Sequence, residues 1–255
     1  MNQKLVGKRA FITGGSEGIG YAIAKAFLAE GAHVVIAARR ELVLRDAANQ
    51  LGHDCGFAVM DLGDPQQVEA AIASAVKQLG GLDILVNNAA ITSPSKTVET
   101  TSLEELQALL DVNLRGSFWA MQKAYPYLKE SKGNVLNLSS MAGVSGQAQH
   151  AAYAMTKGGL NALTKSAAVD WGADGIRVNA LCPAGTWTPA LRRWCGEQKN
   201  PAEVEADLDR LHVLGFCPEA DDVAPVALFL CSSDARFVTG HVQHVSGGSE
   251  CGYRL

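Results

Sequence analysis

The sequence predicts an α/β fold: a doubly wound, seven-stranded parallel sheet with helices on both faces. Two observations predict it. Short apolar runs alternate with longer stretches of helical periodicity almost to the end of the chain, and this alternation is typical of parallel strands joined by crossover helices. A glycine-rich turn also separates the first apolar run from the first helical stretch, at the place where doubly wound folds hold their ligands.

The apolar runs and helical patterns can be assigned in order. We expect strands at residues 9–13, 32–37, 57–60, 82–86, 134–138, 176–181 and 241–245. We expect helices at 20–30 and 41–51, from the Asp64-Pro65 pair, from a capping box at 102–105, and at 151–171. The interruption between 183 and 221 is too short for a second domain. Residues 1–255 are therefore expected to form a single domain, with a substrate-covering insertion, or lid, at about 187–217.

Composition excludes several classes of protein. The 255 residues are 47% hydrophobic and 19% charged, which supplies a core and excludes intrinsic disorder. A net charge of −4 argues against binding to nucleic acid. None of the six cysteines forms a Cys-x-x-Cys pair, and His241 and His244 point to opposite faces of one expected strand, so we expect no metal site. No secretion signal or membrane span is evident, and we expect a cytoplasmic protein.

The glycine-rich turn predicts a nucleotide site. Thr13-Gly-Gly-Ser-Glu-Gly-Ile-Gly20 follows the first expected strand and opens the first helix. Its glycines allow a tight turn and a close approach to a ligand. The N–H groups and dipole of the helix N-terminus suit a pyrophosphate. We expect the cofactor to contact residues of this turn, namely Gly14, Ser16, Glu17, Gly18, Ile19 and Gly20.

The spacing Gly-x-x-x-Gly-x-Gly resembles that of the short-chain dehydrogenase/reductase family. Further motifs follow in the family's order: Asp61-Leu62, Asn87-Asn-Ala-Ala90, Asn113, Ser140 and Tyr153-Ala-Met-Thr-Lys157. The resemblance covers nearly the whole chain and implies a Rossmann fold. It also implies cofactor contacts from Asp61, Leu62, Asn88 and Ala89. Ala90 stands where the family usually has glycine.

Tyr153 and Lys157 are four residues apart on an expected helix, so they share one face. The ammonium of Lys157 is expected to lower the pKa of the Tyr153 phenol towards acid–base chemistry. The resemblance assigns the roles: Tyr153 transfers the proton, Ser140 orients the reacting oxygen, Lys157 holds the nicotinamide ribose, and Asn113 anchors a water in a proton relay. Tyr153 and Lys157 are thus both catalytic and cofactor-binding. Ser139 is a weaker alternative to Ser140, because neighbours on a strand point to opposite faces.

The end of the second expected strand bears on the choice of cofactor. Ala38 occupies the place where NAD-selective relatives usually carry aspartate, and Arg39 could pair with a 2′-phosphate, with Arg40 as a second partner. These residues favour NADP. Glu17 argues mildly for NAD, because some NADP-selective relatives carry a basic residue there. NAD therefore stays open.

The segment after the sixth strand, Pro183-Ala-Gly-Thr-Trp-Thr188, resembles the family's contact with the nicotinamide carboxamide. The resemblance implies that Pro183, Thr186 and Thr188 hold the carboxamide and that the pro-S hydride is transferred. Ala184 replaces the usual glycine.

Three segments reach the expected ligand edge of the sheet: 91–96, 141–150 and 187–216. Besides Ser140 and Tyr153, we expect Gln147, His150, Trp187 and Arg192 to contact the substrate, with His150 the best single candidate. These side chains suit a polar or acidic substrate such as a polyol, a sugar or a hydroxy acid. A long acyl chain or a steroid is less favoured, although leucines of the lid could line such a site.

The leading hypothesis is an NADP-dependent oxidoreductase that interconverts a carbonyl and a secondary alcohol on a polar small molecule. A 3-oxoacyl-[acyl-carrier-protein] reductase and an NAD-linked polyol or sugar dehydrogenase are alternatives. A dinucleotide-sensing protein without catalysis would have lost the tyrosine or the lysine. Enoyl thioester reduction is rejected, because relatives that catalyse it space these two residues further apart. The resemblance also implies a homotetramer, with a dimer as the alternative.

Overall fold

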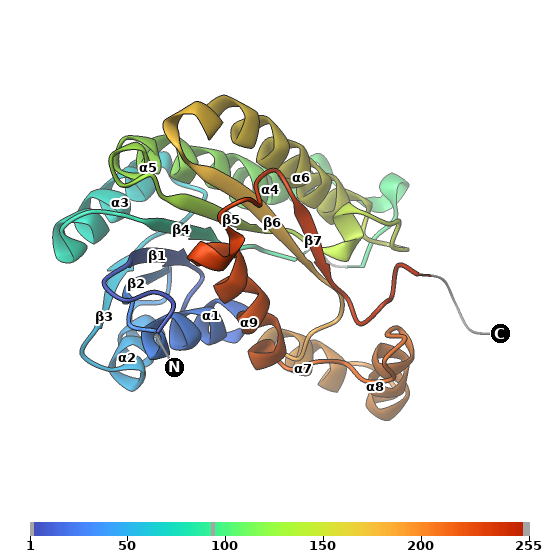
Figure 1. The fold of residues 1–255 in the computed structure, drawn as a ribbon. Helices are drawn as coiled ribbons and strands as arrows, with labels where there is room; N and C mark the ends of the chain where they lie inside the picture. The colour runs from blue at the N-terminus through green and yellow to red at the C-terminus, as the bar shows by residue number, and fades with distance from the viewer. Residues whose placement is uncertain (1–2, 93–94, 252–255) are drawn as a thin grey trace.

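Seven parallel strands form one sheet in the order β3-β2-β1-β4-β5-β6-β7 (Figure 1). The computed structural model describes residues 3–92 and 95–251. The strands are β1 (Arg9–Thr13), β2 (His33–Ala38), β3 (Cys55–Val59), β4 (Ile84–Asn87), β5 (Asn134–Leu138), β6 (Arg177–Pro183) and β7 (Val242–Val245). The expected fold class is confirmed, and each expected strand is present with its ends shifted by a few residues at most.

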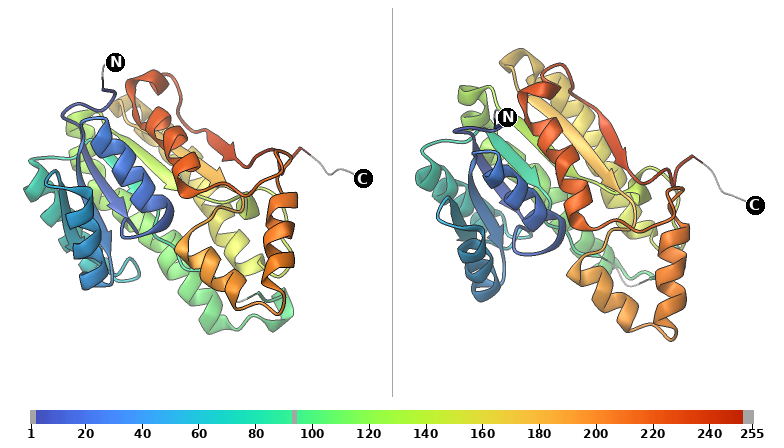
Figure 2. Two further views of the ribbon diagram at one scale, coloured as in Figure 1. Left: turned by 90° about the horizontal axis from the view of Figure 1, so that it is seen from below. Right: turned by 60° about the horizontal axis from the view of Figure 1, so that its bottom comes forward.

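Helices cover both faces of the sheet (Figures 1 and 2). One face carries α1 (Gly18–Ala29), α2 (Glu41–Leu51) and α9 (Ala220–Cys231), and the other carries α3 (Pro65–Leu79), α5 (Ser117–Ser131) and α6 (Ala151–Trp171). The strands alternate between these two layers. In β1, Ile12 joins the core under α1 and α9, whereas its neighbour Phe11 joins the core under α3 and α5. Continuous apolar strands therefore follow from burial on both faces.

The expected long helix after the capping box is interrupted. Ser102 and Glu105 form the capping box as predicted, but α4 (Leu103–Leu110) leads into a π-helical turn, Asp111–Gly116, before α5 begins. Gly116 permits this arrangement, since a Cβ there would lie 2.3 Å from the carbonyl oxygen of Leu62. Such turns occur often at functional sites, and this one carries Asn113.

Two helices follow β6 without belonging to either layer. They are α7 (Pro189–Gly196) and α8 (Pro201–Arg210), and they lie beyond the carboxyl ends of β6 and β7 (Figures 1 and 2). The isolated bridge between Trp187 and Glu219 joins the two ends of this excursion. We call residues 187–217 the α7–α8 segment. In the part of the chain that the structure describes, no helix is long and apolar enough to cross a membrane.

The strand order reverses between β1 and β4, which pair directly although β2 and β3 lie between them in sequence. At such a point the crossover helices leave to opposite faces, and a crevice opens beyond the carboxyl ends of the strands. The sequence motifs follow β1, β4, β5 and β6, so they meet at this edge of the sheet.

Candidate active site

The glycine-rich turn is fixed to the end of β4 by the side chain of Thr13. Its Oγ1 accepts hydrogen bonds from the backbone N–H groups of Asn88 and Ala89, both at 3.0 Å. In return, Nδ2 of Asn88 donates to the carbonyl oxygens of Thr13 and Gly14 at 2.9 and 3.1 Å. Gly14 has a φ of +68°, and a Cβ there would lie 2.7 Å from that amide nitrogen. Only glycine fits this position without displacing Asn88.

The N-terminus of α1 is left open to an anion. Its N-cap, Glu17, makes no side-chain capping hydrogen bond, and the first turn contains no acidic residue. The N–H groups of this turn have no partner within the helix, and with the helix dipole they favour a bound phosphate. The residues present therefore fit the pyrophosphate of a dinucleotide cofactor.

Ser140 and Tyr153 lie together where β5 ends and α6 begins. Ser140 caps a short 3-10 helix, its Oγ accepting from the N–H of Ala142 at 3.1 Å. The same hydroxyl is near enough to the Tyr153 phenol to favour its ionised form. Ser139 is directed elsewhere, because its Oγ donates to the carbonyl oxygen of Lys157 at 3.0 Å. The geometry thus favours Ser140 over Ser139 as the partner of the phenol.

Lys157 is buried, with 3% of its surface exposed. Its Nζ donates to the carbonyl oxygen of Leu138 at 2.7 Å and lies 5.7 Å from the centre of the Tyr153 ring. Burial lowers the pKa of Lys157 to about 8. Two of its three protons remain for other acceptors, such as ribose hydroxyls.

The expectation of a lowered pKa at Tyr153 is wrong for this structure. Burial raises the pKa of Tyr153 to about 12, and the neighbouring Ser140 hydroxyl opposes that rise only in part. Desolvation penalises the phenolate more than Ser140 favours it. At neutral pH the phenol is therefore protonated, which is the form that can donate a proton.

Asn113 is held by the backbone of residue 91. Its Oδ1 accepts from the N–H of Ile91 at 2.8 Å, and its Nδ2 donates to the carbonyl oxygen of Ile91 at 2.9 Å. Nδ2 also lies 3.3 Å from Oγ1 of Thr156, the neighbour of Lys157 on α6. The π-helical turn thus connects Asn113 to the helix that carries Tyr153 and Lys157.

The two arginines after β2 are paired with carboxylates. Nη1 of Arg39 lies 4.0 Å from Oδ2 of Asp61, and Nη2 of Arg40 lies 3.0 Å from Oε1 of Glu17. Both arginine side chains are more than half exposed. Leu62, the neighbour of Asp61, is buried in the core beneath α3 and α5.

The segment after β6 connects to the glycine-rich turn. Pro183 ends the strand, Thr186 is buried, and Thr188 caps α7 by accepting from the N–H of Leu191 at 3.2 Å. A Cβ at Gly18 would lie 3.1 Å from the methyl group of Thr188. Thr188 and the turn are thus in direct proximity, as a shared cofactor site requires.

The expected substrate residues differ in their surroundings. His150 is the N-cap of α6, and its ring meets that of Tyr153 edge-on at 6.5 Å between centres. Arg192 forms an ion pair with Glu219 and lies 4.8 Å above the ring of Trp187. The structure therefore brings His150 to Tyr153, whereas Arg192 is held within its own segment. Gln147 is exposed on the loop before α6.

Cys182 is a neighbour of the site that sequence reasoning missed. Its thiol donates to Oδ1 of Asn161 at 3.7 Å and is close enough to Lys157 for their charges to interact. Burial raises its pKa, so the thiol is protonated. A cysteine inside an apolar strand is indistinguishable from a core residue in sequence, so no signal pointed to it.

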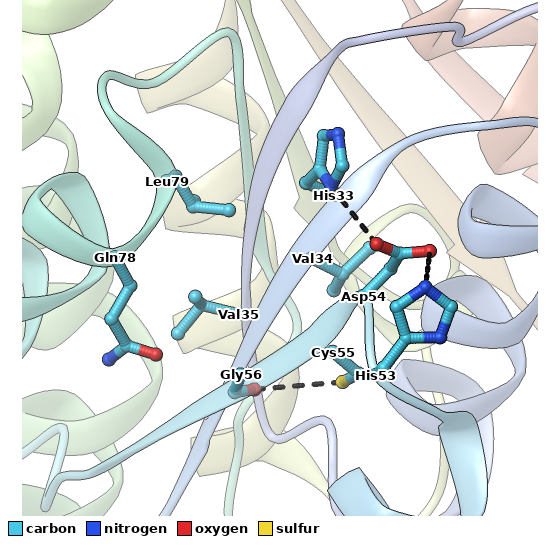
Figure 3. Close-up of a pocket in the computed structure, with 9 residues that line it drawn as sticks. All are labelled: His33, Val34, Val35, His53, Asp54, Cys55, Gly56, Gln78 and Leu79. Atoms are coloured by element: carbon cyan, nitrogen blue, oxygen red, sulfur yellow. Dashed lines mark hydrogen bonds and ion pairs between the residues drawn. The ribbon is translucent and has the colours of Figure 1, made fainter.

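A separate cavity of about 520 Å³ lies at the opposite edge of the sheet, where β2 and β3 begin (Figure 3). There, Asp54 lies between Nδ1 of His33 at 3.4 Å and Nε2 of His53 at 3.2 Å. Among residues 3–92 and 95–251, no group of three or more histidine, cysteine, aspartate or glutamate side chains could hold a metal ion. This cavity is remote from the carboxyl ends of the strands and shares no residue with the site around Tyr153.

Comparison with known proteins identifies the family of the chain but does not point to one activity. A family model described as Enoyl-(Acyl carrier protein) reductase matches residues 14–250. The chain is 35% identical to an L-fucose dehydrogenase of Bos taurus, over 99% of this chain and 93% of that protein. The chain belongs to the short-chain dehydrogenase/reductase family.

Two further proteins extend the comparison. A 2,5-dichloro-2,5-cyclohexadiene-1,4-diol dehydrogenase of Sphingobium indicum is 35% identical over 96% of this chain and 97% of its own. The crystal structure of gox2181 superimposes with a TM-score of 0.92 at 31% identity, covering 98% of both chains. The protein is accordingly an oxidoreductase of this family that uses NAD(P) and acts on the CH–OH group of alcohols.

Proposed function

We propose that this short-chain dehydrogenase/reductase interconverts a secondary alcohol and a carbonyl with NADP(H), on a polar small molecule. The observation that carries the proposal is the convergence of Ser140, Tyr153 and Lys157 where β5 meets α6. A protonated phenol beside a serine hydroxyl and a buried amine can serve acid–base chemistry at a carbonyl oxygen.

The proposed mechanism assigns one task to each side chain. Ser140 hydrogen-bonds the reacting oxygen, and Tyr153 gives that oxygen its proton during reduction or takes it during oxidation. Lys157 holds the nicotinamide ribose with the amine protons that the carbonyl oxygen of Leu138 does not take. Asn113 holds a water through which the proton reaches solvent. When bound, the cofactor supplies or accepts the hydride.

The proposed cofactor contacts surround the glycine-rich turn. The N-terminus of α1 receives the pyrophosphate, and Ala38 leaves room for a 2′-phosphate on Arg39 and Arg40. The proposed set comprises Gly14, Ser16, Glu17, Gly18, Ile19, Gly20, Arg39, Arg40, Asp61, Leu62, Asn88, Ala89, Tyr153, Lys157, Pro183, Thr186 and Thr188.

The proposed substrate is a hydroxylated ring. The names of two relatives specify a sugar and a cyclohexadienediol. We assign Gln147, His150, Trp187 and Arg192 to its recognition, with the α7–α8 segment as the lid. Side chains that combine aromatic faces with hydrogen-bonding groups suit such a ring.

Calorimetric titration with NADP⁺ and NAD⁺ tests the cofactor assignment, followed by oxidation assays on cyclic diols and deoxy sugars. We expect NADP⁺ to bind at least about tenfold more tightly, equivalent to about 1.4 kcal/mol. Arg39→Gln should remove most of this preference. A preference for NAD⁺ that Arg39→Gln leaves unchanged would contradict the assignment and favour an NAD-linked polyol or sugar dehydrogenase.

A 3-oxoacyl-[acyl-carrier-protein] reductase is the second candidate, and the description of the matching family model names such a carrier. An acidic carrier protein would need a basic docking surface. Arg192 and Arg193, two adjacent arginines that would contribute to one, are paired with Glu219 and Glu17. This pairing favours a small-molecule substrate.

We also propose that the protein is a homotetramer. Large apolar side chains are exposed on α4, α5 and α6, among them Leu103, Phe118, Met155 and Val169, and contacts between subunits through these helices would bury them. Light scattering should give about four times the 26.9 kDa chain mass. A mass of one chain would contradict this proposal.

A further inference from the structure

Glu17 joins three parts of the molecule through one carboxylate oxygen. Its Oε1 lies 3.0 Å from Nη2 of Arg40, the N-cap of α2, and 3.5 Å from Nη2 of Arg193, on α7. Glu17 itself lies in the glycine-rich turn. The α7–α8 segment is therefore connected by charge to the place where the adenosine end of the cofactor is proposed to bind.

The two adjacent arginines of α7 point to different partners. Arg192 is engaged by Glu219 and the ring of Trp187, at the base of its own segment. Arg193 instead reaches Glu17. The approach of Thr188 to Gly18 places the start of α7 against the same turn, which supports this contact independently.

Glu17 presents an electrostatic difficulty for a cofactor that carries a 2′-phosphate. If the phosphate pairs with Arg39 and Arg40, it competes with Glu17 for Arg40. A carboxylate left beside a phosphate would oppose binding, because like charges at short range repel each other. Arg193 already pairs with the same oxygen and can keep that carboxylate neutralised while Arg40 turns to the phosphate.

We propose that Arg193 is a specificity-determining residue that acts through Glu17. From α7 it supplies the positive charge that makes a glutamate in the glycine-rich turn compatible with a 2′-phosphate. Arg193 need not touch the cofactor. The proposal rests on the NADP preference proposed above, and it adds that this preference depends on the α7–α8 segment as well as on the residues after β2.

The test is calorimetric binding of NADP⁺ and NAD⁺ to four variants of the full chain: Arg193→Gln, Glu17→Gln, the double variant and Arg210→Gln. Exposed ion pairs contribute at most about 1 kcal/mol, so the ratio of the two dissociation constants should change about two- to fivefold. Arg193→Gln should reduce the preference for NADP⁺, and Glu17→Gln should increase it. In the double variant, loss of Arg193 should have no further effect.

Arg210→Gln is the matched control. Arg210 is an exposed arginine of α8 whose partner is Asp207, so its loss removes the same charge from the same segment without reaching the glycine-rich turn. The ratio of the two dissociation constants should stay at the wild-type value in this variant. A ratio that changes as much as in Arg193→Gln would show a general charge effect and contradict the proposal.

The remaining outcomes separate this inference from the proposed function. If the wild type prefers NADP⁺ and Arg193→Gln leaves the ratio unchanged, the inference fails while the cofactor assignment stands. Equal weakening of both cofactors in Arg193→Gln also contradicts it, because that is the result of a purely structural contact. A wild type that prefers NAD⁺, with no effect of Arg39→Gln, overturns both.

Discussion

Lys157 lies at the candidate active site, and the burial of its amine there costs folding free energy. Its amine is nearly inaccessible to water and has a single backbone acceptor, Leu138, among the contacts that the structure describes. Burial therefore lowers its pKa from 10.5 to about 8. A downward shift of this size means that folding disfavours the protonated amine by about 3 kcal/mol at neutral pH. Conflict between stability and function is common at active sites.

Replacing Lys157 by methionine should stabilise the protein while abolishing turnover. The gain at pH 7 should be about 2 kcal/mol, because about 1 kcal/mol is lost when the carbonyl oxygen of Leu138 loses its donor. The free energies of unfolding of both proteins can be measured in urea at pH 7 and pH 9.5. Lys165→Met, at an exposed position of the same helix, is the control and should change little.

The pH dependence has a defined sign. In the unfolded chain the lysine titrates near 10.5, and in the folded chain near 8. The free-energy cost of burying the protonated Lys157 is fully present below pH 8. Between pH 8 and pH 10.5 the unfolded state binds more protons than the folded state, so this cost decreases as the pH rises. The advantage of Lys157→Met should therefore shrink by about 2 kcal/mol at pH 9.5. A variant less stable than the wild type at pH 7 would refute this account of Lys157.

At the scale of secondary-structure elements, the short helix that follows β5 packs against α6. This contact sets the distance between Ser140 and Tyr153. Gly143 permits it: a Cβ there would lie 2.6 Å from the backbone carbonyl carbon of Lys157. Neither backbone can move without shifting one of the reacting side chains. This close approach is a property of paired elements and could not be read from one segment of sequence.

Gly143→Ala should destabilise the protein by about 1–3 kcal/mol, the usual range for overpacking, and should reduce turnover. Thermal unfolding and steady-state rates measure both effects. Gly146→Ala is the matched control, since a Cβ at that exposed glycine meets nothing within 4 Å. If Gly143→Ala and Gly146→Ala show the same stability and the same turnover, the close contact at Gly143 does not position the site.

The sequence predicted the positions of strands and helices more accurately than the place where a helix is interrupted. Apolar periodicity and the capping box at Ser102 identified strands and helices to within a few residues. The π-helical turn around Asn113 has no such signal, because the contact that accommodates it joins Gly116 to Leu62, more than fifty residues earlier in the chain. Long-range ion pairs such as Glu17–Arg193 were equally invisible, since no local pattern relates a turn near the N-terminus to α7.

At the scale of the whole molecule, the strand order explains why motifs scattered along the chain converge. β1, β4, β5 and β6 are neighbours in the sheet, so the residues after each of them reach one edge. The order of the family motifs therefore indicates the edge at which Ser140 lies, while the meeting of Ser140 with Tyr153 and Lys157 also depends on the packing of α6 against the segment after β5. The pKa of Tyr153 could not be inferred in this way, because it depends on burial that only the assembled layers create.

The most direct test of the central claim is the Tyr153→Phe variant, assayed for NADP⁺-linked oxidation of the best ring alcohol and titrated with NADP⁺ by calorimetry. Removal of a general acid–base group should lower turnover by at least about a hundredfold. The dissociation constant of NADP⁺ should rise by no more than about tenfold, the effect of losing one hydrogen bond, since Lys157 and the glycine-rich turn remain. Turnover close to that of the wild type would contradict the assignment of Tyr153 as the proton-transferring residue.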